Sequence, residues 1–404
     1  MLIVLTKLGS PELVGQFALG LAITAPIMIF ADMRLRAVQV ADARNEYKFG
    51  DYLSLRMGTT ALALLVIAGF ALFSDFGWEM ALIILALGAA TAFESISDVF
   101  YGLLQKRDRM DFIAKSKMIK GPLSLLALGL GFYLTGRVVW GVMGLATARA
   151  FILAWYDLRI SAYVLRTLPQ SIGAVKDVGE EREVLRPRWD MRGLAKLLWL
   201  ALPLGIVALL ISLRSNVPRY FIEQYLGARD LGIFVAIAYL MIPGVTVATA
   251  LGESASPRLA KYYEAGNGPA FRGLLLKLVG IGALIGIAGV LAALTFGREI
   301  LSLLYGPEYA RLDLFRWMTI AAGISYVGMF LGYGILAARY FRVQMVLLTS
   351  VVATLALACL WLVPLFGLGG AAAALVITSF VHASGASVAI ARALSSLHGR
   401  SRSL

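Results

Sequence analysis

The chain is poor in the residues that bind metals or form disulfides. Its 404 residues include one cysteine and two histidines. Because Cys359 is the only cysteine, no internal disulfide can form, and together with His382 and His398 it makes no recognisable cluster of metal ligands. We therefore expect no metal site and no bound cofactor, and we interpret Cys359 as a small core residue.

Signature motifs of several enzyme classes are also missing. The sequence contains no phosphate-binding GxxxxGK[ST] loop, no GxSxG elbow, no HExxH pair, and no Asp-x-Asp of the kind that many sugar-nucleotide transferases use to hold a metal. These absences argue against ATP-driven transport by this chain alone. We expect no catalytic residues and a protein that is not an enzyme.

Acidic residues are scarcer than basic ones, and charge of either sign is rare. The chain has 24 acidic and 37 basic residues, yet charged residues make up only 15% of it and hydrophobic residues 60%, with a mean hydropathy of +0.81. Such a composition is far more apolar than a soluble domain, of which about half is apolar. The net charge of +13 is explained by positive loops facing anionic lipids, so membrane lipids are expected partners and nucleic acids are not.

The apolar residues gather into eleven stretches that can each cross a hydrocarbon core about 30 Å thick. Lys and Arg fall mainly in alternate loops, 28 in one set and six in the other. Since cytoplasmic loops retain their cations, the first set and the C-terminus are predicted to be cytoplasmic. The pattern predicts an all-α polytopic membrane protein. Its expected spans are residues 12–31, 55–74, 79–104, 117–135, 138–158, 197–217, 229–251, 275–296, 315–337, 344–364 and 369–391.

An odd number of spans with a cytoplasmic C-terminus places the N-terminus outside. The opening residues MLIVLTKL are apolar but much too short to span a membrane or to act as a signal peptide. The simplest interpretation is that they are the tail of a first helix missing from this sequence, and that the parent protein has twelve helices with both ends in the cytoplasm.

An internal repeat supports that parent. The stretch LGSPELVGQFALGLAITAP, which begins at Leu8, returns as LGARDLGIFVAIAYLMIP, which begins at Leu226, if one residue is treated as an insertion. Gly15 then aligns with Gly232. A unit with an even number of helices enters the membrane twice in the same direction. We therefore expect two six-helix bundles related by a pseudo-two-fold axis near the membrane normal, in a protein expected to be a monomer.

The predicted domain boundaries follow from the one long polar segment. Residues 1–164 form the N-terminal bundle with five visible spans, and residues 197–404 form the C-terminal bundle with six. The intervening residues 165–196 are polar and are interpreted as a cytoplasmic linker, with a regulatory or partner-binding module as the alternative. Paired bundles of this kind form a cleft and can rock around it.

These motifs resemble a known family. The LG-x-x-x-x-x-G-x-F-A opening, its recurrence in the second half, and the run ASPRLA that begins at Ala255 are similar to bacterial polysaccharide flippases, O-antigen-type and Wzx-like, of the multidrug/oligosaccharidyl-lipid/polysaccharide exporter superfamily. The resemblance covers essentially the whole chain. It implies a MATE-like pair of six-helix bundles in a bacterial cytoplasmic (inner) membrane. It also implies export of an undecaprenyl-pyrophosphate-linked oligosaccharide by alternating access, for synthesis of lipopolysaccharide, capsule or exopolysaccharide. Polysaccharide polymerase or export machinery are implied partners.

A pyrophosphate crossing the membrane requires positive charge in the cleft, and Arg suits phosphate by bidentate contact. Arg149 lies about 15 Å of helix from either end of its span, too deep to reach water easily. We predict that it contacts the anionic head of the substrate; the alternative is an ion pair with Glu94 or Asp98. Arg214 and Arg219 are predicted to form an outer cationic rim of the cleft, with snorkelling to the headgroups as the alternative.

Glu94 and Asp98 lie four residues apart on one helix face. Two carboxylates in a setting of low dielectric raise each other's proton affinity, so they are candidates for a site that binds a coupling proton or Na⁺. The alternative is that they neutralise Arg149 or face a solvated cleft.

Three prolines are predicted to bend helices. Pro26 and Pro243 occupy matched positions in the repeat, and each removes a backbone donor from a helix. Pro203 is expected to act in the same way. Such kinks shape a central cavity or serve as bending points; the alternative is a fixed bend with no role in motion.

Two other functions fit parts of the pattern. An ion-coupled multidrug antiporter of the MATE type has the same architecture but favours acidic or aromatic sites for cationic drugs, whereas Arg149 and Arg214 favour an anionic head. A membrane-embedded glycan polymerase or ligase should have a sizeable loop outside the cell, whereas the largest loop here is predicted to be cytoplasmic.

Overall fold

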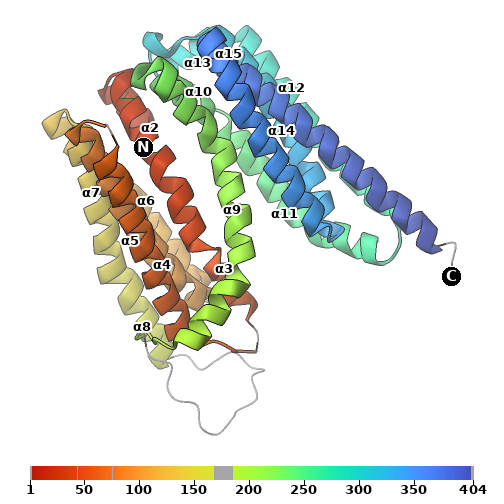
Figure 1. Ribbon diagram of the computed structural model, residues 1–404, viewed down its shortest axis with the longest axis horizontal. Helices are drawn as coiled ribbons and strands as arrows, with labels where there is room; N and C mark the ends of the chain where they lie inside the picture. Colours follow the sequence, from red (N-terminus) through yellow and green to blue (C-terminus); the bar gives the residue numbers. More distant parts are fainter. Residues whose placement is uncertain (1, 43, 75, 168–184, 402–404) are drawn as a thin grey trace, which may run out of the picture. The chain divides into compact units, whose positions relative to one another are not determined.

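The computed structural model describes residues 2–42, 44–74, 76–167 and 185–401, so most of the predicted linker 165–196 lies outside the described residues. Over the described ranges every regular element is a helix, which confirms the all-α prediction (Figure 1). The elements are α1 Leu2–Leu8, α2 Pro11–Asp32, α3 Leu35–Ala41, α4 Phe49–Phe73, α5 Trp78–Lys106, α6 Met110–Thr135, α7 Val138–Ile152, η1 Leu153–Asp157, α8 Leu158–Thr167, α9 Met191–Leu226, α10 Ala228–Tyr239, α11 Ile242–Glu264, α12 Gly268–Thr295, α13 Gly297–Leu304, η2 Pro307–Tyr309, α14 Leu312–Ala337 and α15 Phe341–Ser401.

Each of the eleven predicted spans is present in the described chain. Nine helices are long and apolar enough to cross a membrane, and the α10–α11 pair, bent by 43°, makes a tenth. The last of the nine, within α15, runs for 55 residues and is divided at Gly367, where φ is 59° and ψ is −135°. It therefore supplies two spans. The protein is a multi-pass membrane protein.

Several helices extend beyond the predicted spans. α4 begins at Phe49 rather than at residue 55, α6 begins at Met110 rather than at 117, and α9 continues to Leu226 rather than ending at 217. In each case, polar or charged residues that resemble a loop in the sequence lie within a helix, because that helix continues past its apolar stretch.

The chain divides into two compact units. Unit 1 comprises residues 20–212, and unit 2 comprises residues 2–19 together with 213–404. The division passes through α2 and α9, so each of these helices contributes to both units. The domain boundaries predicted from the linker remain a prediction.

Unit 1 is built around α5, which packs against α4 and α7, while α6 packs against α7 (Figure 1). Its interior includes Phe49 and Phe100, whose ring centroids lie 5.5 Å apart. α6 and α7 approach closely because Gly144 faces Ala127: a Cβ at Gly144 would lie 2.5 Å from the Ala127 carbonyl oxygen. Close approach of this kind is typical of membrane helices.

Unit 2 is built around α14, which packs against α11, α12 and α15 (Figure 1). Phe271 and Phe330 are fully buried within its apolar core. α12 and α14 cross at Gly286 and Gly323, where a Cβ at Gly286 would lie 2.5 Å from the Cα of Gly323. The small residues allow the two backbones to meet.

The predicted prolines occupy two kinds of position. Pro243 lies in the first turn of α11, directly after the 43° bend, so the helix breaks just before this proline rather than around it. A proline suits the first turn because its missing N–H would have no helical partner there. α2 continues through Pro26 and α9 through Pro203 without interruption of the helix.

Candidate functional site

Arg149 lies on α7, eleven positions after the helix begins at Val138. Its Nη1 donates a hydrogen bond to the carbonyl oxygen of Ala90 on α5, at 3.1 Å. In the described part of the chain neither Glu94 nor Asp98 forms an ion pair with Arg149, although Glu94 attracts it electrostatically. The neutralising ion pair considered as an alternative is therefore not found, and the partly buried guanidinium can still bind an anion.

Glu94 instead pairs with Lys120 of α6, at 3.3 Å from Oε2 to Nζ. The same Nζ lies 3.3 Å from Oδ2 of Asp157 and donates to the hydroxyl of Tyr101 at 2.7 Å. The second Asp157 oxygen accepts a hydrogen bond from Ser116 at 2.5 Å. The Asp157 side chain is 0% exposed and that of Lys120 is 7% exposed. The Lys120 cluster comprises Glu94, Ser97, Tyr101, Ser116, Lys120 and Asp157.

A π-helical segment positions Asp157. η1 interrupts the helical run between α7 and α8, and Asp157 is its last residue. The wider π turn shifts the register of the residues that follow, and short π segments are frequent at functional sites. This local irregularity directs a carboxylate toward Lys120, which a charge buried at this depth needs for neutralisation.

Asp98 faces a different pair of cations. Arg36 Nη1 lies 3.2 Å from Asp98 Oδ1, and Arg56 Nη2 lies 3.8 Å from Oδ2. Arg56, whose side chain is 0% exposed, also forms an ion pair with Asp32, which accepts a hydrogen bond from Ser95. The Arg56 cluster comprises Asp32, Arg36, Arg56, Ser95 and Asp98.

The structure thus separates the two carboxylates that the sequence placed together. Glu94 belongs to the Lys120 cluster and Asp98 to the Arg56 cluster, although both project from α5. Their side chains are 39% and 35% exposed, so each side chain faces a cation and remains partly accessible. A site for a coupling ion that uses them stays a prediction.

Arg214 lies deeper in its helix than predicted. Because α9 continues to Leu226, twelve residues, or about 18 Å of helix, follow Arg214. Its Nη2 donates to Oγ of Ser325, near the middle of α14, at 2.8 Å. The predicted span 197–217 places Arg214 close to its end, so the helix continues farther past Arg214 than the sequence predicts.

Arg219 lies on the same helix rather than in a loop after it. It is partly buried near Tyr220 and Tyr239, with which it interacts electrostatically. Within the described ranges, neither Arg214 nor Arg219 forms an ion pair with a carboxylate. Arg149 belongs to unit 1 and these two residues to unit 2, so a shared substrate cleft stays a prediction.

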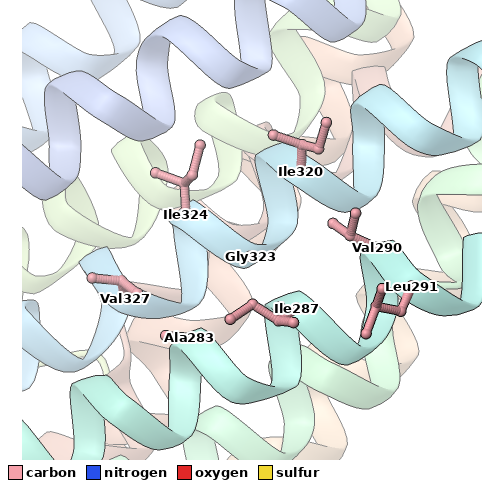
Figure 2. Close-up of a pocket in the computed structure, with 9 residues that line it drawn as sticks. Ala283, Ile287, Val290, Leu291, Ile320, Gly323, Ile324 and Val327 are labelled. Atoms are coloured by element: carbon pink, nitrogen blue, oxygen red, sulfur yellow. The ribbon is translucent and has the colours of Figure 1, made fainter. Parts of the chain in front are cut away.

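Two surface pockets differ in chemistry. The first, about 330 Å³, lies between α12 and α14 beside the Gly286–Gly323 crossing. Figure 2 shows Ile287 and Leu291 of α12 opposite Ile320 of α14, and its lining is wholly apolar, so it suits a hydrocarbon chain and not a sugar. The second pocket, about 610 Å³, belongs to unit 1 and is lined by Ala37, Val38, Ala41, Asp42, Arg44, Glu46, Tyr47, Tyr52, Leu200 and Leu204.

Sequence reasoning missed most of the buried charge network. Arg56 and Lys120 lie near the starts of the predicted spans 55–74 and 117–135, and Asp157 lies at the end of the predicted span 138–158. Asp32 and Arg36 lie in the predicted loop directly after the span 12–31. The available signal is weak, because a charge so close to the end of a span is ordinarily interpreted as a loop or interfacial charge.

Comparison with known proteins identifies the family. Residues 1–263 match the polysaccharide biosynthesis protein family, which is well over half of the chain. The chain belongs to that family. A relative, capsular polysaccharide biosynthesis protein CapF of Staphylococcus aureus, is 28% identical over 386 residues, covering 94% of this chain and 91% of CapF.

Solved structures show which fold this family member has. An inward-facing multidrug resistance MATE family transporter of the MOP superfamily matches with a TM-score of 0.75 at 15% identity, over 98% of this chain and 94% of its own. A MOP superfamily transporter from Pyrococcus furiosus matches with a TM-score of 0.63 at 15% identity, over 98% and 91%. This member of the polysaccharide biosynthesis protein family therefore has the MATE-like fold.

Proposed function

We propose that the protein is a flippase that moves an undecaprenyl-pyrophosphate-linked oligosaccharide across the bacterial cytoplasmic membrane by alternating access. Membership in the polysaccharide biosynthesis protein family and the MATE-like fold support an exporter in polysaccharide synthesis. The hydrated head of such a lipid cannot cross hydrocarbon unaided, whereas its polyprenyl tail already prefers the bilayer. A protein with this role therefore needs to shield only the head and to compensate its pyrophosphate charge.

The observation that carries the proposal is the contrast between paired and unpaired cations inside the helices. Arg56 and Lys120 are neutralised by carboxylates and are almost inaccessible. Arg149, by contrast, donates a hydrogen bond to a backbone carbonyl and forms no ion pair in the described chain. A charge held at this depth without a carboxylate is unfavourable unless it serves a ligand. A pyrophosphate is a ligand that fits a guanidinium.

The same contrast disfavours the rival antiporter of cationic drugs. A large organic cation needs a pocket with an excess of carboxylate charge, whereas Asp32 and Asp98 already face Arg56 and Glu94 already faces Lys120. The partly exposed sides of Glu94 and Asp98 leave room for a small ion only. The arginines Arg149, Arg214 and Arg219 would also repel a cation. An anionic substrate is the better match to the described charges.

Complementation tests the function. The full-length gene is expressed in a strain that lacks its own flippase for a lipid-linked glycan, and surface glycan is quantified at equal protein level. We expect the wild type to restore glycan and Arg149→Gln to lower it at least tenfold, since the guanidinium is lost. Arg137→Gln is the matched control, because Arg137 is an exposed residue at the start of the same helix.

Two results would contradict the proposal in different ways. Normal glycan from Arg149→Gln would make Arg149 a structural charge. Efflux of ethidium by the wild type, without restoration of glycan, would favour the drug antiporter. Restored glycan without ethidium efflux supports the flippase.

We further propose that a proton or Na⁺ bound near Glu94 and Asp98 couples transport to an ion gradient, because both carboxylates are partly exposed. Uptake of a fluorescent lipid-linked disaccharide is measured in proteoliposomes with an imposed gradient of either ion. Glu94→Gln or Asp98→Asn should abolish stimulation by that gradient. Glu79→Gln, an exposed carboxylate in the first turn of the same helix, should leave it unchanged.

The proposed orientation places the C-terminus in the cytoplasm of a bacterium, with membrane lipids and polysaccharide polymerase or export machinery as partners. The charge distribution of the loops supports it. Alkaline phosphatase fused to the C-terminus should be inactive, and a fluorescent protein fused there should be bright. The reverse pair of results would overturn this orientation.

A further inference from the structure

A buried histidine in unit 2 has no hydrogen-bond partner in the part of the chain that the structure describes. His382 lies in the second half of α15 and is 4% exposed. Neither Nδ1 nor Nε2 of its ring has a partner among the described residues. Burial removes the water that would otherwise satisfy both nitrogens, which is unfavourable unless something replaces it. An imidazole in this state needs a partner that the described chain does not supply, either a ligand or a buried water.

The residues around His382 come from three helices. A Cβ at Gly328 of α14 would lie 2.7 Å from His382 Nδ1, so the glycine allows the ring to lie against that helix. Ser325, one turn earlier on α14, accepts the 2.8 Å hydrogen bond from Arg214 of α9. Arg214 is close enough to His382 to act on it electrostatically. α9, α14 and α15 therefore bring a guanidinium, a hydroxyl and an imidazole together.

The chemistry of these groups selects the charge of the ligand. Arg214 carries a permanent positive charge and five N–H donors, of which Ser325 takes one. A neutral imidazole adds one donor, and the hydroxyl of Ser325 can donate as well as accept. A cation would be repelled by Arg214, and no group of three or more His, Cys, Asp or Glu that could hold a metal occurs in the described ranges.

We propose that Arg214, Ser325 and His382 form an oxyanion site inside unit 2 that binds a phosphate or pyrophosphate group. Its depth, about 18 Å of helix from the end of α9, fits an anion that crosses the membrane better than one bound at the surface. Under the proposed function, on which the identity of the natural ligand rests, this anion is the pyrophosphate of the carrier lipid. His382 then donates one hydrogen bond to the anion beside the guanidinium of Arg214.

Binding to the purified full-length protein in detergent tests the site. Isothermal titration calorimetry is done with farnesyl pyrophosphate, inorganic pyrophosphate and farnesol at one ionic strength. The variants are Arg214→Gln and His382→Phe, which keeps a ring of similar size without nitrogens. Thr378→Val is the matched control: Thr378 is also buried on α15, but its hydroxyl donates to the Ala374 carbonyl of its own helix.

We expect His382→Phe and Arg214→Gln each to weaken binding of farnesyl pyrophosphate at least tenfold, as for loss of a hydrogen bond to a charged group. Thr378→Val should leave the affinity within twofold, and farnesol should bind wild type and variants alike. Weaker binding of inorganic pyrophosphate as well would show that the site binds the free anion. An effect on farnesyl pyrophosphate alone would show that the anion is bound as a lipid headgroup.

A stability measurement keeps the test decisive. Since His382→Phe removes two unsatisfied polar atoms, we expect it to raise the thermal transition of the ligand-free protein while weakening binding. A histidine whose nitrogens are satisfied only by buried water would instead leave the affinity for farnesyl pyrophosphate unchanged, and that result overturns the proposal. If His382→Phe does not fold, unchanged affinity in Arg214→Gln overturns it equally.

Failure of this site and failure of the proposed function are distinguishable. Suppose that the wild type restores surface glycan and that His382→Phe and Arg214→Gln bind farnesyl pyrophosphate normally. The proposed function is then supported and the proposed site is wrong. If the wild type restores no glycan but binds farnesyl pyrophosphate through these residues, the proposed site is supported and the proposed function is wrong.

Discussion

Gly15 of α2 and Gly232 of α10, which the internal repeat aligns with each other, lie against one another in unit 2. A Cβ at Gly15 would lie 1.8 Å from the Ala228 carbonyl oxygen, and one at Gly232 would lie 1.9 Å from that of Pro11. The two copies of the motif therefore meet at their shared glycine. Its repetition in the sequence reflects a single crossing to which both copies contribute.

The close contact at this crossing leaves no room for a side chain at either glycine. Gly232→Ala places a methyl group where a backbone carbonyl already lies, and we expect it to destabilise the protein by at least about 1–3 kcal/mol. The thermal transition in detergent should fall by about 3 °C or more. Gly289→Ala on α12 is the control, because a Cβ there meets no atom within 4 Å. Equal transitions for both variants would refute the close crossing.

The Lys120–Asp157 pair should behave as a coupled unit. Lys120→Met leaves Asp157 buried without its cation, and breaking such a pair costs about 3–5 kcal/mol. Adding Asp157→Asn should recover part of this loss, so thermal transitions of the two single variants and the double variant should be non-additive. Lys117→Met, an exposed lysine on the same helix, should have little effect. Additive losses would contradict the ion pair.

Arg56 and Arg149 should separate structural charge from substrate charge. Arg56→Gln removes the neutralising cation from Asp32 and Asp98, so we expect lower thermal stability. Arg149→Gln removes no ion pair, so its stability should stay near that of the wild type while transport is lost. Purified variants are compared by thermal unfolding and by glycan restoration. Strong destabilisation by Arg149→Gln would show that Arg149 has a structural role.

Gly367 should be irreplaceable at the turn that divides α15. Its φ of 59° and ψ of −135° are accessible to glycine and strained for other residues, so Gly367→Ala should cost about 1–3 kcal/mol. Gly369→Ala, two residues later, is the control because it has no atom within 4 Å of a Cβ and no positive φ. The thermal transitions of the two variants should differ clearly; identical values would contradict the turn.

The positions of the membrane helices could be predicted because hydrocarbon imposes a local rule. A span must be apolar over about 20 residues whatever it packs against, so all eleven were visible before any packing was known. The sequence predicts the ends of the helices less well. α4, α6 and α9 continue beyond their apolar stretches. Arg56 and Lys120, near the starts of their predicted spans, therefore lie well inside helices, and Arg219 lies in α9 rather than after it.

The candidate site depended more on tertiary packing. Glu94 and Asp98 share a helix face by spacing alone, yet their partners come from different helices and place them in separate clusters. The partner of Asp157 depends on the π-helical segment η1, which has no sequence signature comparable to an apolar stretch. Which cation meets which carboxylate is settled by side chains far apart in the chain.

By itself, the sequence determined the membrane class, the helix positions and the presence of deep arginines, because burial in hydrocarbon acts on each segment separately. Only the tertiary structure decided which deep charges are neutralised and which remain available, because an ion pair depends on distances of a few ångströms between different helices. Arg56 and Arg149 are the same residue type, yet Arg56 forms an ion pair and Arg149, among the described residues, forms none.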